Sequence, residues 1–370
     1  MPDVLIGIAG GGGRIGRALV THLRAGGCTR LRVGSRHARA AATELNEEHV
    51  HLDIDDPSSL TQFCTGCRIV VNCAGPAYRV RDRVARAAFR AEADYVDPGG
   101  DEPLFALLAP HVGTQLDGRA VLSAGFMPGL TGLLPRWLAR QGFTRARCLT
   151  AYTCIRDRFT HAAAVDYLDS LRNGYGAAQS IWRKGAIVRA QEPPRVGIVL
   201  PFLSGEASVY PYFTREAERL ARALALEEAD WYTVFDGPNM WRTLARLSQV
   251  QYGPDGMVEL ARELVRAAEV DLFGRSPEQT LIFRLAGAGL GRELERTLIV
   301  RVSSTYDASA LLCALVVFAL IAEEIPCGVH FAADRLDPIR AAELLKSAAT
   351  LTSFELLDGP LENGADEGVV

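Results

Sequence analysis

Lysine is almost missing from this sequence of 370 residues, which contains only Lys184 and Lys346, so nearly all of its 40 basic residues are arginines. So few amines argue against catalysis through a lysine Schiff base. A positive excess is missing too, since 44 acidic residues give a formal net charge of −4. Proteins that bind nucleic acid need a basic excess, so we expect a small-molecule partner and no nucleic acid.

Long apolar runs and paired metal-ligand motifs are also absent. The most apolar segment, 308–322, is shorter than the roughly 20 residues of a membrane helix, so we expect a helix buried inside the protein. No basic segment precedes the first apolar run, and no secretory signal is expected. Cys64 and Cys67 form a CxxC pair, but neither a second pair nor paired histidines follow at ligand spacing, which predicts no metal site. Scattered cysteines indicate reduced thiols, and we expect a cytoplasmic protein without membrane contact.

Short apolar strands alternate with helical segments over residues 1–125. This alternation is typical of a parallel sheet that helices cover on both faces. From about residue 126 longer strands appear, and the last two of them indicate an antiparallel hairpin in a second, α+β domain. Helices at 308–323 and 338–348 complete the fold, and the acidic tail 358–370 is expected to be disordered. The expected strands are 4–9, 31–34, 49–54, 69–74, 94–97 and 120–124, and the hairpin joins 280–287 to 292–303.

The first strand runs directly into a glycine-rich turn, Gly10-Gly11-Gly12-Gly13-Arg14-Ile15-Gly16. Gly11, Gly13 and Gly16 match G-x-G-x-x-G in the first βα turn, the context in which this motif binds dinucleotides. Glycines allow a tight turn and a close approach of the backbone to a pyrophosphate, which accepts hydrogen bonds from the free N–H groups at the helix start. We therefore predict a Rossmann domain, with a doubly wound parallel sheet, whose turn 10–16 binds the cofactor.

The end of the second strand favours NADP over NAD. An NAD site carries Asp or Glu there, about 20 residues after the turn, to bind the ribose 2′-hydroxyl. This sequence has Ser35 and Arg36 instead, and no carboxylate stands in 33–37. Ser35 can donate a hydrogen bond, while Arg36, assisted by Arg39, can pair with a 2′-phosphate and stack on adenine. The alternative is that Arg36 is a solvated surface arginine.

Three loops follow strands at the sheet edge where a doubly wound fold binds its ligand. We expect their small residues to contact the cofactor, namely Ala74, Gly75, Pro76, Ala124 and Gly125. The loops read Asn72-Cys-Ala-Gly-Pro-Ala-Tyr78, Tyr95-Val-Asp-Pro-Gly-Gly-Asp-Glu102 and Ser123-Ala-Gly-Phe-Met-Pro-Gly-Leu130.

These loops, with the motifs N-C-A-G-P-x-Y, Y-V-D-x-x-G-D and A-G-F-x-P-G-L, resemble the saccharopine dehydrogenase/reductase-like family of NAD(P)-dependent oxidoreductases. The resemblance extends over 4–135, and a weaker similarity to the family appears at 327–338. It implies hydride exchange between the nicotinamide and an imine, and a homodimer. It also implies a Rossmann domain at 1–126 completed by 308–350, a substrate-binding and dimerisation domain at 127–307, and C-terminal helices that return to the first domain.

The sequence departs from the family pattern at Met127, where the lysine-pathway reductases carry Asp, and in a shorter substrate domain. Both differences point away from saccharopine itself and toward a less charged imine. Phe126 and Met127 are the substrate-binding candidates of this loop.

Imine reduction needs a protonated acceptor, which a general acid or an already protonated imine can supply. The catalytic candidates are Asp97, where the resemblance implies a substrate contact, together with Tyr78 and Tyr152. Asp97 could instead cap the turn before the next helix, and Tyr78 could roof the nicotinamide. In the second domain, Arg156 or Arg158 could hold a substrate carboxylate, or both could be surface arginines.

The sequence therefore predicts a biosynthetic, NADP(H)-dependent oxidoreductase that reduces the C=N bond of a small amino-acid-derived or natural-product substrate. Two alternatives stay open. One is an enoyl (C=C) reductase on the same fold, and the other is a non-catalytic NADP-binding sensor. The aromatic loops 182–185 and 236–241 could wall a pocket or form dimer contacts.

Overall fold

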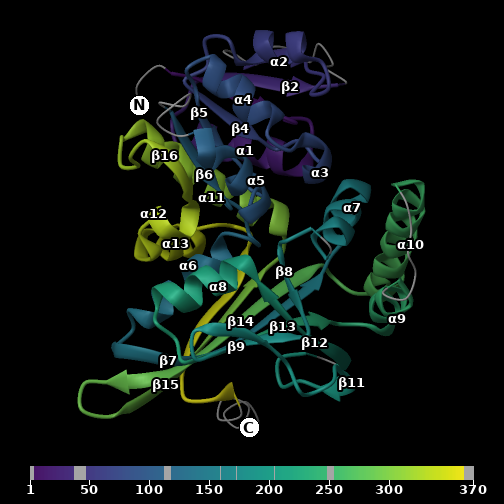
Figure 1. Cartoon of the computed structure of the whole chain (residues 1–370), viewed down its shortest axis with the longest axis vertical. Coiled ribbons are helices and arrows are strands. Elements are labelled where there is room, and N and C mark those ends of the chain that lie inside the picture. Colours follow the sequence, from purple (N-terminus) through teal and green to yellow (C-terminus); the bar gives the residue numbers. More distant parts are fainter. Residues whose placement is uncertain are drawn as a thin grey trace. The chain divides into compact units, whose positions relative to one another are not determined.

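The computed structural model describes residues 4–36, 47–111, 118–158, 160–171, 173–203, 205–247 and 254–361, and Figure 1 traces the chain. The chain divides into two compact units. Unit 1 consists of Met1–Leu133 and Thr305–Leu345, and unit 2 consists of Leu134–Ser304 and Lys346–Val370. Arg39 and the tail from residue 362 onward lie outside the described residues, so the disorder expected of that tail stays a prediction.

Unit 1 is built on a seven-stranded sheet with the order β16-β6-β5-β4-β1-β2-β3, in which all neighbours are parallel. The chain runs from β1 to β2 and β3 on one side and then returns to β4 on the other side of β1, which is the topological switch of a Rossmann fold. The predicted doubly wound sheet is confirmed. Its strands are β1 (Leu5–Ala9), β2 (Arg30–Ser35), β3 (Glu47–His51), β4 (Ile69–Asn72), β5 (Asp94–Val96), β6 (Arg119–Leu122) and β16 (Gly328–Phe331).

Two strands of this sheet differ from the sequence-based expectation. The strand expected at 49–54 lies earlier, because Glu47–His51 is the segment that pairs with β2. The four residues of β16 were not predicted as a strand, since so short a segment carries no periodic signal; pairing with β6 makes them the edge strand.

Helix α11 (Thr305–Ile321) is apolar on every side and almost wholly buried, as predicted for this segment. It packs against α1 (Arg14–Ala25) within unit 1. None of the described helices is long and apolar enough to cross a membrane. The other helices that belong wholly or partly to unit 1 are α2 (Pro57–Cys64), α3 (Ala77–Val80), α4 (Arg83–Arg90), α5 (Glu102–Leu108), α6 (Leu130–Ala139), α12 (Ala332–Arg335) and α13 (Pro338–Lys346).

Unit 2 contains a mixed, ten-stranded sheet centred on β7 (Phe143–Arg156), which is parallel to β13 (Glu228–Phe235) and antiparallel to β14 (Glu278–Gly289). The predicted hairpin is confirmed, since β14 pairs antiparallel with β15 (Glu293–Val302). Strand β17 (Leu351–Asp358) was not expected, because its polar residues interrupt the apolar pattern; it pairs with β15. The remaining elements are β8 (Gly176–Ala178), β9 (Ser180–Arg183), β10 (Ala186–Arg189), β11 (Arg195–Val199), β12 (Glu206–Thr214), α7 (His161–Ser170), α8 (Arg215–Ala223), α9 (Pro238–Leu247) and α10 (Pro254–Leu272).

Candidate functional site

The glycine turn between β1 and α1 is closed by backbone contacts that leave no room for a side chain at Gly10 or Gly16. The N–H groups of Gly10 and Gly11 both donate to the carbonyl of Gly34, at 2.9 and 3.0 Å. Gly10 has φ +76°, and a Cβ there would lie 2.6 Å from the backbone nitrogen of Ala74. A Cβ at Gly16 would lie 2.5 Å from the Cα of Gly11. The turn therefore requires glycine, and it touches the loop after β4.

The start of α1 fits the phosphates of a dinucleotide. Its N-cap residue, Gly13, has no side chain to accept from the first N–H groups, and the first turn carries no acidic residue. These N–H groups therefore remain available to an anion. Arg17 Nη1 donates to the carbonyl of Gly12 at 2.6 Å, and the guanidinium of Arg14 lies 4.9 Å from the ring centre of Tyr306. The residues present thus fit the cofactor's pyrophosphate.

Arg36 follows β2 directly, and its side chain is exposed. No hydrogen bond or ion pair links it to another described residue. Ser35 ends the strand beside Gly12, where an added Cβ would lie 3.4 Å from the Cβ of Ser35. The arrangement places both NADP candidates next to the glycine turn.

Asp97 lies just after β5 and is only 6% exposed. Its Oδ2 accepts from Tyr95 Oη at 2.5 Å and from Asn72 Nδ2 at 3.0 Å. Its Oδ1 accepts from the N–H groups of Gly99 and Gly100, at 2.9 and 2.7 Å. The turn-holding role that the sequence left open is therefore visible in the geometry, and four donors surround the carboxylate. Burial, followed by the charge of Asp97, raises the pKa of Tyr95 well above its usual range.

The loop after β6 is fixed to α11 and to the loop after β5. Ser123, at φ +54°, donates through its N–H and its Oγ to the carbonyl of Gly100, at 2.7 and 3.0 Å. The N–H of Phe126 donates to Ser309 Oγ at 2.9 Å, and Cys313 Sγ donates to the carbonyl of Ala124 at 3.1 Å. The three predicted loops are thus parts of one hydrogen-bonded structure.

The remaining residues predicted in unit 1 differ in their exposure to solvent. Ala124 and Phe126 are buried, whereas Met127 is 38% exposed. Gly75 is exposed, and Pro76 is the N-cap residue of α3. Tyr78 lies in α3, but its side chain is outside the described part of the structure. Of the two substrate-binding candidates in this loop, Met127 is therefore the one with an accessible side chain.

Tyr152 belongs to an apolar cluster on one face of the unit 2 sheet. Its ring stacks on Tyr232 at 5.2 Å between centres and tilts against Phe202 at 5.7 Å. Burial, with the charge of Asp230 and the neighbouring Tyr152, raises the pKa of Tyr232 to about 12. The structure thus gives Tyr152 a packing role within unit 2.

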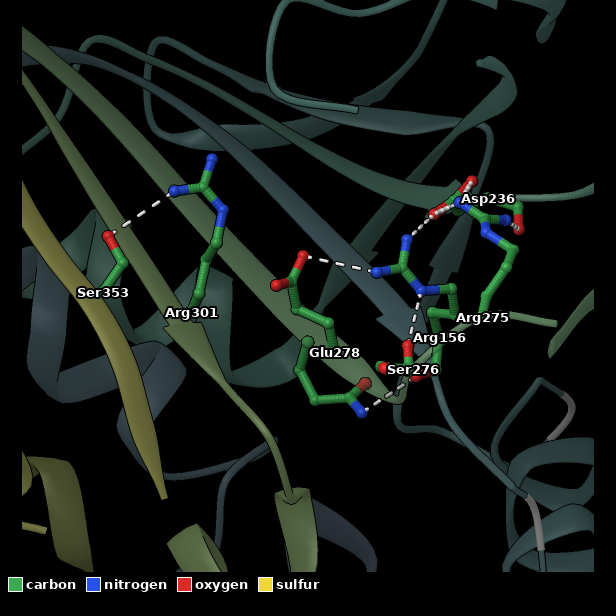
Figure 2. Close-up of polar contacts among 8 residues, drawn as sticks. Arg156, Asp236, Arg275, Ser276, Glu278, Arg301 and Ser353 are labelled. Atoms are coloured by element: carbon green, nitrogen blue, oxygen red, sulfur yellow. Dashed lines mark hydrogen bonds and ion pairs between the residues drawn. The ribbon is translucent and has the colours of Figure 1, made fainter. Parts of the chain in front are cut away.

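The guanidinium of Arg156 is already engaged, as Figure 2 shows. Nη1 donates to Asp236 at 2.5 Å, Nε to the carbonyl of Ser276 at 3.0 Å, and Nη2 to Glu278 at 3.5 Å. Asp236 also accepts from Arg275 at 2.8 Å. A substrate carboxylate would have to displace these partners. The sequence could not show them, because they come from strands far apart in the chain.

Arg158 lines a groove of about 500 Å³ on unit 2. Arg275, Glu269 and the 88% exposed Phe273 line the same groove. Arg158 is therefore accessible from a hollow, as its predicted substrate contact would require.

Sequence reasoning gave no role to Asn72, Tyr95, Ser309 or Cys313. Asn72 and Tyr95 each interrupt an apolar strand with a polar group, and Ser309 interrupts the apolar segment of α11. A polar group in a buried element needs a hydrogen-bond partner, and that was the available signal.

A Rossmann sheet with a glycine turn and an open helix start defines the class of dinucleotide-binding proteins. Residues 6–112 match the family model described as the saccharopine dehydrogenase NADP binding domain. This segment is therefore an NADP-binding domain of that type, and the predicted cofactor, NADP(H), is confirmed.

The fold of the whole chain is similar to apo saccharopine dehydrogenase (L-Glu forming) from Saccharomyces cerevisiae, with a TM-score of 0.70 at 13% identity, over 96% of this chain and 100% of that one. An oxidoreductase from Lactococcus lactis is 21% identical over 32% of this chain and 68% of its own, with a TM-score of 0.26. No curated protein matches the sequence. The predicted resemblance is confirmed for residues 6–112 by the family model, and the fold of the chain is confirmed as that of saccharopine dehydrogenase.

Proposed function

We propose that this protein reduces the C=N bond of a small amino-acid-derived or natural-product imine with NADPH. One observation carries the proposal: the three loops of the family resemblance join in a single buried network, and the first of them touches the glycine turn. The NADP-binding domain supports the cofactor, and the resemblance supports an imine as the acceptor.

Bound NADPH would supply the hydride. The N–H groups of turn 10–16 would hold its pyrophosphate, and Arg36, with Ser35, its 2′-phosphate. Ala74, Gly75 and Pro76, with Ala124 and Gly125, would line the nicotinamide half. Arg36 and Gly75 are exposed, and the pyrophosphate would be held by backbone N–H groups.

Within unit 1, we propose Met127 as a substrate contact. Within unit 2, considered by itself, we propose that Arg158 can bind a carboxylate in the groove that it lines. Because four donors already surround the Asp97 carboxylate, we favour an imine that arrives protonated over a proton from Asp97. For an imine that arrives neutral, Tyr78 is the proposed proton donor, whereas Tyr152 keeps its packing role in unit 2. We further propose a cytoplasmic homodimer, which light scattering would show as the mass of two chains.

A panel of hydride acceptors tests the reaction. We expect NADPH oxidation with cyclic imines of amino-acid size and much slower oxidation with enoyl substrates of matched shape, measured at 340 nm (the absorbance band of NADPH). Turnover restricted to the enoyl compounds would contradict the C=N assignment. Tight NADPH binding without turnover of any acceptor would favour the sensor.

Arg36→Ala tests the 2′-phosphate assignment. Losing a charge-assisted, two-pronged contact of about 1.5–3 kcal/mol should raise the Kd for NADPH by roughly 10- to 100-fold. The Kd for NADH, which lacks the phosphate, should change less than about threefold. Arg340→Ala, an exposed arginine on α13 that pairs with Glu324, is the control and should change neither value. Equal losses for NADPH and NADH would show that Arg36 does not read the phosphate.

A further inference from the structure

Two buried aspartates at opposite ends of β5 differ in how their charge is compensated. Asp94 accepts from Arg119 and Arg68. Asp97 accepts only from neutral groups, the Tyr95 hydroxyl, the Asn72 amide and two backbone N–H groups. Within the described residues no arginine, lysine or histidine pairs with Asp97. A buried carboxylate without a counterion is costly, and the hydrogen bonds offset only part of that cost.

The hydrogen-bond pattern suits an ionised Asp97. Both backbone N–H groups and the Asn72 amide can only donate, the Tyr95 hydroxyl is able to donate as well, and a carboxylate accepts all four hydrogen bonds at its two oxygens. After burial, which acts most strongly, Asp97 raises the pKa of Tyr95 and of Cys73, and it contributes to the raised pKa of Cys313.

Through its carboxylate and its backbone carbonyl, Asp97 ties together the loops that line the predicted nicotinamide side of the site. Asn72 donates to Asp97 and accepts from the N–H of Ala74 at 3.2 Å. The N–H of Ala124 donates to the carbonyl of Asp97 at 3.0 Å. On the neighbouring loop lies a second acid, Asp101, which accepts from Ser123 Oγ at 3.4 Å. In a Rossmann fold, ligands bind at the carboxyl ends of these strands, so the charge borders the reacting groups.

We propose that the uncompensated charge of Asp97 makes this site select a cationic hydride acceptor, a protonated C=N bond, over a neutral C=C or C=O bond. The inference deepens the proposed function and rests on it. When the carbon of an iminium ion accepts a hydride, a new C–H bond forms. The electron pair of the C=N π bond then moves to the nitrogen, and the product is a neutral amine. The positive charge passes to the nicotinamide, so the ligands carry +1 beside Asp97 before and after the transfer.

A neutral acceptor has the opposite charge balance. Its reduction leaves a cation on the nicotinamide and a new anion, an enolate or alkoxide, near a carboxylate that has no counterion. An opposite charge within about 4–6 Å favours a charged form by about 1–3 pKa units, and a like charge disfavours it. Asp97 thus stabilises the iminium throughout and penalises the anion that any neutral acceptor would produce.

The test removes the charge without changing the side-chain shape. In Asp97→Asn we expect the ratio of the Kd for NADP⁺ to the Kd for NADPH, measured by calorimetric titration, to rise about tenfold, since only the oxidised nicotinamide is cationic. Tyr95→Phe removes one donor and keeps the charge, so its ratio should stay within about threefold of wild type. The exchange variant N72D/D97N moves the carboxylate to the neighbouring residue with matched donors and acceptors, and it should restore the ratio.

A second measurement compares acceptors. With Asp97→Asn, kcat/KM for a permanently cationic N-methyl cyclic iminium should fall at least about tenfold relative to a neutral enone of the same shape. The proposal would be overturned if Asp97→Asn folds and its ratio of the Kd for NADP⁺ to the Kd for NADPH is unchanged. It would also be overturned if Asp97→Asn and Tyr95→Phe changed this ratio equally. If Asp97→Asn does not fold, a wild-type protein that binds NADPH more tightly than NADP⁺ overturns it. Absence of turnover with every acceptor would refute the proposed function alone, because the Kd ratio still tests the charge.

Discussion

Replacing Gly10 by alanine is expected to abolish measurable NADP binding. The new Cβ would lie 2.6 Å from the nitrogen and 2.7 Å from the Cα of Ala74, and these are backbone atoms that cannot rotate away. The residue also has φ +76°, a conformation that costs an alanine about 1 kcal/mol. The turn must therefore move away from the loop after β4. We expect the Kd for NADP⁺ to rise more than about 100-fold and unfolding free energy to fall by roughly 3 kcal/mol.

Gly66→Ala is the matched control for this prediction. Gly66 has φ +77°, nearly the angle of Gly10, but a Cβ there meets nothing within 4 Å. It should lower stability by only about 1 kcal/mol, measured by urea unfolding, and leave NADP⁺ binding unchanged. The difference between the two variants isolates the close contact from the backbone angle. Equal effects of both substitutions on binding would mean that the contact between the turn and Ala74 is not needed.

The glycine turn could be predicted because its signal is local. Seven consecutive residues, a preceding apolar strand and a following helix specify both the conformation and the ligand. The order of the strands β1 to β6 follows from the same kind of information, since alternating strands and helices form a parallel sheet with few permitted topologies. The family resemblance added the three loops after β4, β5 and β6 to the predicted site, and in the structure hydrogen bonds connect these loops.

The rest depends on contacts between residues that are far apart in the chain. Nothing near Phe126 indicates that Ser309 will accept from its N–H, and nothing near Arg156 indicates that Asp236 and Glu278 will occupy its guanidinium. The sequence therefore left Arg156 as either a carboxylate ligand or a surface arginine, and neither describes its buried ion pairs. For Asp97 the local sequence allowed two roles, and only the positions of Asn72 and Tyr95 distinguish a proton donor from a charge held by four donors.

Arg119→Leu is expected to cause a large loss of stability. Arg119 is 7% exposed and donates through its N–H, Nε and Nη2 to Asp94, at 3.1, 3.0 and 2.5 Å. The hydrogen bond to this carboxylate raises the pKa of Arg119 above its usual value. Without the guanidinium, Asp94, which is 2% exposed, keeps a charge that burial makes costly. The expected cost is about 3–5 kcal/mol.

Arg68 supplies the comparison, because it donates to the same Oδ2 of Asp94, at 3.0 Å, from a side chain that is 45% exposed. Water and salt screen this second pair, so Arg68→Leu should cost no more than about 1 kcal/mol. In the double variant Asp94→Asn/Arg119→Leu no buried charge remains, and much of the lost stability should return. These values come from urea unfolding followed by circular dichroism. If Arg119→Leu and Arg68→Leu lowered the unfolding free energy equally, the burial of the Asp94 charge would not be the cause of the stabilisation, and each contact to Asp94 would contribute alike.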